Sequence, residues 1–214
     1  MKVCTCLNPL HTCLAIFGCV LGYNKISDEM KDEELVKLVE TVGYKEGLPV
    51  VVNPGILDPK EFIDTVLKVR VPNPFMPDTP QRIATDTSQK IVVRFGETMK
   101  SYMASSELDC SSLVYIPLAI AGWLRYMLAV DDAGKKYELA PDPMNEEIQE
   151  QLKDIVIGKP ETFKDQLKPI LSNERLFFTD LYKAGVGEKI ENMFREMIAG
   201  PGTVRATIHK YVTA

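Results

Sequence analysis

Helix start signals recur along the whole chain, and they constrain its fold more than any other feature. A capping or loop residue followed by proline is typical of a helix start, because the first turn has no use for the amide hydrogen that proline lacks. Such pairs open predicted segments at Asp58-Pro59, Thr79-Pro80, Lys159-Pro160 and Gly200-Pro201. We expect the first two segments to run as helices to about Val69 and Ala104, respectively.

Helical periodicity fills the stretches between these starts. Apolar residues repeat at spacings of three and four over 32–42, 146–157 and 190–198. Strand signals are scarce: 48–52 is the best candidate, 135–139 is weaker, and strict alternation is nowhere sustained. The sequence therefore predicts a mainly α, multi-helical protein with at most a short strand pair. We expect one domain over residues 1–214.

Composition and charge exclude several function classes. The formal net charge of −5 argues against a nucleic acid or an anionic membrane as the main partner. The apolar run 113–130 is near the lower length limit for crossing a bilayer, but Arg125 lies within it. We predict a buried core helix there and no membrane association.

The cysteines indicate the redox context. There are five, an odd number, and four of them fall within residues 4–19. This is not the pattern of a secreted disulfide framework, and no paired ligands follow at metal-binding spacing. We expect reduced, packed thiols, no metal site and a cytoplasmic location.

The first candidate site lies at the start of the sequence, where Lys2, Asn8 and His11 occur together. Asn8 and His11 are three residues apart and would share a helix face. A lysine whose pKa is lowered by burial could accept a proton, while an amide and an imidazole could bind a reacting oxygen. A histidine ahead of an apolar helix can equally serve as a cap or a half-buried structural residue. Residue types alone leave both interpretations open.

The second candidate site is a proline-rich loop, 71–79, followed by a predicted helix. On one continuous helix Arg82, Asp86 and Lys90 would lie at positions i, i+4 and i+8. This could be an exposed charge ladder worth a few tenths of a kcal/mol per pair. Thr85 and Gln89 lie nearby, and so many hydrogen-bonding groups also suit a polyhydroxylated ligand.

The two segments together resemble the C-terminal domain of the mannitol dehydrogenase family of long-chain polyol and hexuronate dehydrogenases. One family signature looks like K-x-R-x-L-N-x-x-H, which here corresponds to residues 2–11. The other looks like R-F-x-N-P-x-x-x-D followed by R-I-x-x-D-x-S-x-K. Residues 70–78 and 82–90 correspond to it. The resemblance extends through the segment around Trp123 and over the whole chain.

The resemblance implies a fold and a set of roles. The fold would be like the 6-phosphogluconate dehydrogenase C-terminal domain, preceded in the family by a Rossmann domain that this chain lacks. Lys2 would be the catalytic base, and Asn8 and His11 would bind and polarise the reacting oxygen. Arg82 and Lys90 would bind the substrate. NAD would be the cofactor, and most of its binding site would lie in the missing domain. The cofactor-binding residues stay unknown, and no metal would take part.

The expected activity is the interconversion of a keto sugar or keto-hexuronate and its polyol or aldonate. Fructuronate and mannonate are the first choice, and fructose and mannitol are the alternative. A non-enzymatic helical module that kept the fold is a further alternative. Hydride transfer needs a bound nicotinamide, so we predict that this chain alone is inactive.

Two departures from the signature bear on Lys2. Six positions separate Lys2 from Asn8, where the family pattern looks like five. Pro9 would also fall inside the expected helix, where proline removes a hydrogen bond. A one-residue bulge would accommodate both departures. Without such a bulge, Lys2 points elsewhere and is not the base.

Overall fold

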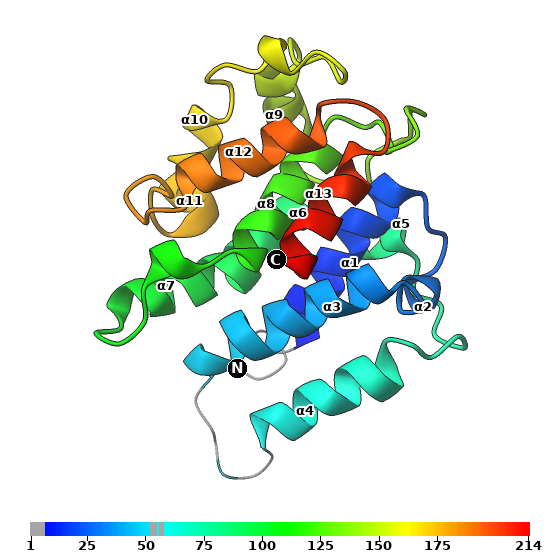
Figure 1. Cartoon of the computed structure of the whole chain (residues 1–214), viewed down its shortest axis with the longest axis vertical. Coiled ribbons are helices and arrows are strands. Elements are labelled where there is room, and N and C mark those ends of the chain that lie inside the picture. The colour runs from blue at the N-terminus through cyan, green and yellow to red at the C-terminus, as the bar shows by residue number, and fades with distance from the viewer. Residues whose placement is uncertain (1–6, 52–54, 56–57) are drawn as a thin grey trace.

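A computed structural model shows how these elements are arranged, and it describes residues 7–51, 55 and 58–214. The described part is helical, and its only β-pairing consists of isolated antiparallel bridges, Val130 with Lys136 and Val156 with Lys159. The mainly α fold is therefore confirmed (Figure 1). The helices are α1 (Asn8–Leu21), α2 (Ile26–Glu29), α3 (Glu33–Thr41), α4 (Pro59–Thr65), α5 (Pro80–Ile83), α6 (Thr87–Ile91), α7 (Glu97–Ala104), α8 (Tyr115–Tyr126), α9 (Asn145–Leu152), α10 (Lys168–Leu171), α11 (Glu174–Phe177), α12 (Gly187–Met197) and α13 (Thr203–Thr213).

Three of these helices continue into wider, π-helical turns. α3 continues into Val42–Gly47, α4 into Val66–Arg70 and α6 into Val92–Gly96. Short 3₁₀ turns occupy Leu48–Val50, Cys110–Ser112 and Pro160–Thr162. The strand predicted at 48–52 is therefore wrong over its described part, because Pro49 lies in a helical turn that continues from α3.

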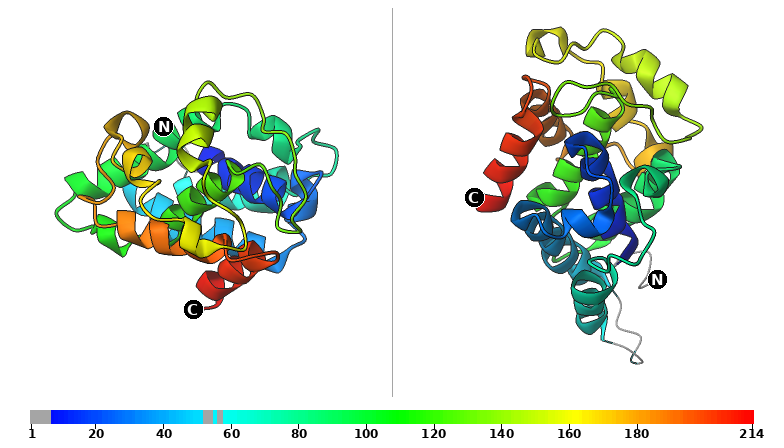
Figure 2. Two further views of the ribbon diagram at one scale, coloured as in Figure 1. Left: turned by 90° about the horizontal axis from the view of Figure 1, so that it is seen from above. Right: turned by 90° about the vertical axis from the view of Figure 1, so that its right-hand side faces the viewer.

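Two helices, α1 and α8, form the centre of the molecule. Both are buried along nearly their whole length, and they approach closely because Gly122 has no side chain where the Phe17 ring packs. A Cβ atom on Gly122 would lie 2.5 Å from that ring. α12 packs on α8, and α5 packs on α1. The other elements surround this core, with α4 at one end and α9 and α10 at the other (Figures 1 and 2).

The run 113–130 is a core element, as predicted. α8 occupies its centre, and Arg125 is fully buried. Its guanidinium donates hydrogen bonds to the carbonyls of Met197 (3.2 Å), Val130 (2.5 Å) and Asp131 (3.2 Å). These bonds compensate the cost of burying the charge. Over the described residues, no helix is both long and apolar enough to span a membrane.

The cysteines with described positions also match the expectation. Cys13, Cys19 and Cys110 are free and buried. The described residues contain no group of three or more His, Cys, Asp or Glu side chains that could hold a metal ion. Cys4 and Cys6 lie outside the described residues.

One helix prediction needs correction. The segment that starts at Thr79-Pro80 is not one continuous helix to Ala104: it breaks after α5 and resumes as α6. Asp86 lies at the break with φ of +54°, a left-handed conformation that aspartate adopts more readily than most residues. Its amide donates to the Pro141 carbonyl at 2.8 Å, which ties the break to a distant loop.

Candidate functional site

The first turn of α1 carries two of the predicted site residues, Asn8 and His11. Pro9 lies in this same first turn, not in the helix interior as expected, and proline is well tolerated there. The proline therefore does not argue against this helix start. Lys2 lies outside the described residues, so the structure leaves its assignment as base untested.

His11 faces the proline-rich loop. Its Nε2 atom lies 3.4 Å from Oδ2 of Asp78, and the two side chains are only 12% and 13% exposed. The other carboxylate oxygen, Oδ1, accepts a hydrogen bond from the Arg82 guanidinium. Asp78 thus joins an imidazole from α1 to a guanidinium from α5. Asp78 is part of the second family signature, but neither residue type nor signature assigned it a role.

The charge ladder predicted for Arg82, Asp86 and Lys90 does not form. Arg82 belongs to α5 and pairs with Asp78, whereas Lys90 belongs to α6, beyond the break. The Lys90 ammonium instead donates to the Ile83 carbonyl at 2.8 Å. This bond brings Lys90 to the end of α5, and the charge of Arg82 still lowers the pKa of its ammonium.

A distant loop holds α6 in place. The Asp142 carboxylate accepts hydrogen bonds from the Ser88 amide (2.7 Å), the Ser88 hydroxyl (2.6 Å) and the Thr87 hydroxyl (3.2 Å). The Trp123 indole of α8 donates to the same Thr87 hydroxyl at 3.3 Å. Asp142 thus supplies the cap that Asp86 does not give this helix. This cap is not predictable from local sequence, because 54 residues separate Asp142 from Ser88.

Burial and the surrounding charges favour the neutral form of the His11 imidazole. Burial lowers the pKa of His11, and the positive charges of Arg70, Arg94 and Arg82 lower it further, while Asp78 opposes them. A neutral imidazole can donate a hydrogen bond to a carbonyl oxygen from one nitrogen and accept one at the other.

Burial and neighbouring positive charges also act on Lys90. Burial and the nearby Arg94 and Arg82 lower the pKa of its ammonium, against Asp86 and Asp142. Cationic side chains therefore crowd around His11 and Lys90. Such a surface suits an anionic or multiply hydroxylated small molecule.

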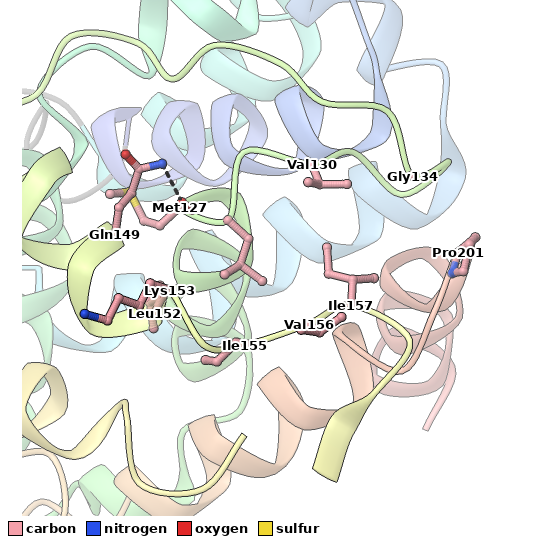
Figure 3. Close-up of a pocket in the computed structure, with 11 residues that line it drawn as sticks. Met127, Val130, Gly134, Gln149, Leu152, Lys153, Ile155, Val156, Ile157 and Pro201 are labelled. Carbon is pink, nitrogen blue, oxygen red and sulfur yellow. Dashed lines mark hydrogen bonds between the residues drawn. The ribbon is translucent and has the colours of Figure 1, made fainter. Parts of the chain in front are cut away.

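A separate cavity of about 480 Å³ contains none of the predicted site residues. It lies between the end of α8, α9 and the chain that follows α9 (Figure 3). Apart from Gln149 and Lys153 it is mostly apolar, so it does not suit a sugar. Its lining residues are Met127, Leu128, Val130, Gly134, Gln149, Leu152, Lys153, Ile155, Val156, Ile157 and Pro201.

Comparison with known proteins identifies the family. Residues 1–198 match the model of the mannitol dehydrogenase C-terminal domain. The chain belongs to this family. The resemblance noted from the two signatures is therefore confirmed.

Curated relatives of this chain include two D-mannonate oxidoreductases. The chain is 58% identical to a D-mannonate oxidoreductase of Thermotoga maritima over 212 residues, which is 99% of this chain and 39% of that protein. It is 28% identical to the D-mannonate oxidoreductase of Escherichia coli over 82% of this chain and 34% of that one. The chain thus spans well under half the length of these relatives.

A solved structure of the family has the same fold. Pseudomonas fluorescens mannitol 2-dehydrogenase, in a ternary complex with NAD and D-mannitol, superposes with a TM-score of 0.80. The match covers 99% of this chain and 40% of that one, at 20% sequence identity. The helical architecture predicted for a mannitol dehydrogenase C-terminal domain is thus confirmed.

Proposed function

We propose that this chain is the substrate-binding and catalytic part of an NAD(H)-dependent oxidoreductase that interconverts fructuronate and mannonate. The observation that carries the proposal is the 58% identity to a D-mannonate oxidoreductase over 99% of the chain. The cations around His11 support it, because a hexuronate carries a carboxylate that Arg82 or Lys90 can bind.

The cofactor would be held mostly by an amino-terminal Rossmann domain. The described residues contain no sheet, and hence no βαβ unit of the kind that binds dinucleotides. Bound NAD would accept a hydride from the substrate carbon during oxidation. The residues of this chain would manage the substrate oxygen and the proton.

Each site residue would then have a defined task. The Nε2–H of neutral His11 lies 3.4 Å from Asp78, beyond ordinary hydrogen-bond length, so it would donate a hydrogen bond to the reacting oxygen when substrate binds. The Asn8 amide would help to orient that oxygen. Lys2 would take the hydroxyl proton when mannonate is oxidised and return it when fructuronate is reduced. Arg82 and Lys90 would hold the carboxylate or hydroxyls at the far end of the substrate.

The experiment is to produce the chain joined to its upstream cofactor domain and to follow NADH oxidation with fructuronate and with fructose. Faster turnover of fructuronate supports the proposal, and faster turnover of fructose supports a mannitol 2-dehydrogenase instead. No turnover of either, in a folded protein that binds NADH, would favour the non-enzymatic helical module. The 214-residue chain alone is expected to be inactive.

Two variants test the assigned roles. Lys2→Ala should abolish turnover, and a normal rate would show that another residue is the base. His11→Ala should lower kcat by about 100-fold or more, as expected for loss of a positioned acid-base or polarising group. His209→Ala is the matched control, because this second histidine is 61% exposed and pairs with Glu34 on the surface. Equal losses in the two histidine variants would refute the role of His11.

A further inference from the structure

Arg94 reaches the first turn of α1 from another part of the chain. It lies in the π-helical segment Val92–Gly96 that continues α6, 86 residues from Asn8. π-helical turns often mark functional sites, since the extra residue per turn changes where side chains point. Neither sequence signature quoted above includes this arginine.

The guanidinium of Arg94 completes a closed set of hydrogen bonds. Its Nη1 atom donates to the Asn8 carbonyl at 3.1 Å and also to the Thr12 hydroxyl. The Thr12 hydroxyl in turn donates to the same Asn8 carbonyl at 2.9 Å. Thr12 is 1% exposed, so these bonds are partly shielded from water. Because Leu7, the residue that precedes α1, provides no side-chain cap, this cross-link restrains the first turn of the helix.

We propose that Arg94 is a positioning residue: it fixes the first turn of α1 and thereby places Asn8 and His11 against the substrate. The role rests on the proposed function of these two residues. Arg94 connects them to α6, which carries Lys90, so one side chain sets the spacing between the two halves of the site.

The charge of Arg94 adds a second effect at His11. Among the described residues, the charged groups that act on this imidazole are Asp78 from the proline-rich loop, Arg82 from α5, Arg70 from the end of the α4 segment and Arg94. Of these only Asp78 raises the pKa of His11. Removing the Arg94 charge should therefore raise that pKa, whereas a purely mechanical support would leave it unchanged.

The first test needs no activity and uses the 214-residue chain. The sequence has only two histidines, so the His11 signals are readily assigned in an NMR titration. Arg94→Gln should raise the His11 pKa and accelerate amide hydrogen exchange in the first turn of α1. Arg94→Lys keeps the charge and should leave the His11 pKa near the wild-type value. An unshifted His11 together with unchanged exchange in Arg94→Gln would overturn the proposal.

The second test is kinetic, in the protein that includes the cofactor domain. Arg94→Gln should lower kcat about 100-fold with a smaller change in KM, because misplacing reacting groups by about 1 Å costs this much. Thr12→Val should lower kcat less, because it keeps the bond from Arg94 to the Asn8 carbonyl. A kcat for Arg94→Lys that is higher than that for Arg94→Gln supports the proposal.

The matched control is Arg195→Gln. Arg195 likewise donates two hydrogen bonds to a separate segment, to the carbonyls of Pro160 and Phe163, each at 3.2 Å. It also stacks on the Phe163 ring, but it lies on α12. Its loss should reduce stability without changing the His11 pKa or kcat. An equal fall in kcat in both arginine variants would assign Arg94 a general structural role and overturn the proposal. A wild-type protein without turnover would refute the proposed function alone, since the titration still decides the role of Arg94.

Discussion

Replacing Glu29 with glutamine is expected to remove the contribution of this carboxyl group to the pH dependence of the unfolding free energy. Glu29, in α2, is fully buried, and neither carboxylate oxygen has a hydrogen-bond partner. Its carboxyl group packs against the backbone of α1 at Gly18, where a Cβ atom would lie 2.2 Å from Oε1. Burial, with a smaller contribution from the Asp32 charge, raises the pKa of Glu29 well above 4.5.

The magnitude follows from proton linkage. Above the unfolded-state pKa the unfolded chain releases this proton, while the folded chain retains it. The free energy of unfolding therefore falls as pH rises, by at most about 1.4 kcal/mol per pH unit, until pH passes the folded-state pKa. Below pH 4.5 the full contribution of the neutral carboxyl is present. Glu29→Gln places a permanently neutral group in the same space and should lose this slope.

The assay is urea denaturation of wild type and Glu29→Gln at intervals from pH 5 to pH 8. The difference in unfolding free energy between them should move in favour of the variant as pH rises, whatever its value at pH 5. Glu107→Gln, at an exposed position, is the control and should keep the wild-type pH dependence. A difference that stays constant across this range would show that Glu29 is ionised in the folded protein, and would refute the reasoning.

Three further predictions concern packing, capping and thiol reactivity. Gly18→Ala should cost about 1–3 kcal/mol by urea denaturation, because its Cβ would also lie 2.8 Å from the Pro80 ring; an unchanged midpoint would mean that the neighbouring side chains yield freely. Asp142→Ala should cost about 2 kcal/mol and accelerate amide exchange in α6, since the Ser88 amide and hydroxyl lose their acceptor; unaltered exchange there would contradict the capping role. Burial raises the pKa of Cys19 to about 12 and the pKa of Cys110 to about 11, and it also raises the pKa of Cys13. These three thiols should therefore resist a thiol-specific reagent at pH 8 until denaturant is added. Mass-spectrometric mapping of rapid native labelling on any of them would contradict this.

Helices were predictable where their signals are local. The Asp58 and Thr79 side chains cap α4 and α5 at the positions that the start signals indicated, and Asp32 caps α3 at the start of a stretch predicted from its periodicity. The same signals were less informative elsewhere. Lys159-Pro160 opens only a 3₁₀ turn, and after Gly200-Pro201 the helix α13 begins at Thr203.

The candidate site was predictable only in part. The signatures selected Lys2, Asn8, His11, Arg82 and Lys90, of which Lys2 lies outside the described residues. The structure gathers His11, Arg82 and Lys90 within one set of interacting charges. Asn8 joins the group through its carbonyl and Arg94. Residue spacing gave the wrong arrangement for the helix that carries the cations, because spacing alone does not reveal a break.

The sequence by itself determined the helical class, the family and the candidate residues, because caps, periodicity and signatures depend on neighbours a few positions apart. Tertiary structure decided the break at Asp86, which a carbonyl from the distant Pro141 stabilises. It also decided the pairing of His11 with Asp78, the bridge from Arg94 to α1 and the burial of Glu29. Each of these depends on groups brought together from separate segments, and their energies arise from distance and desolvation, which exist only once the chain has folded.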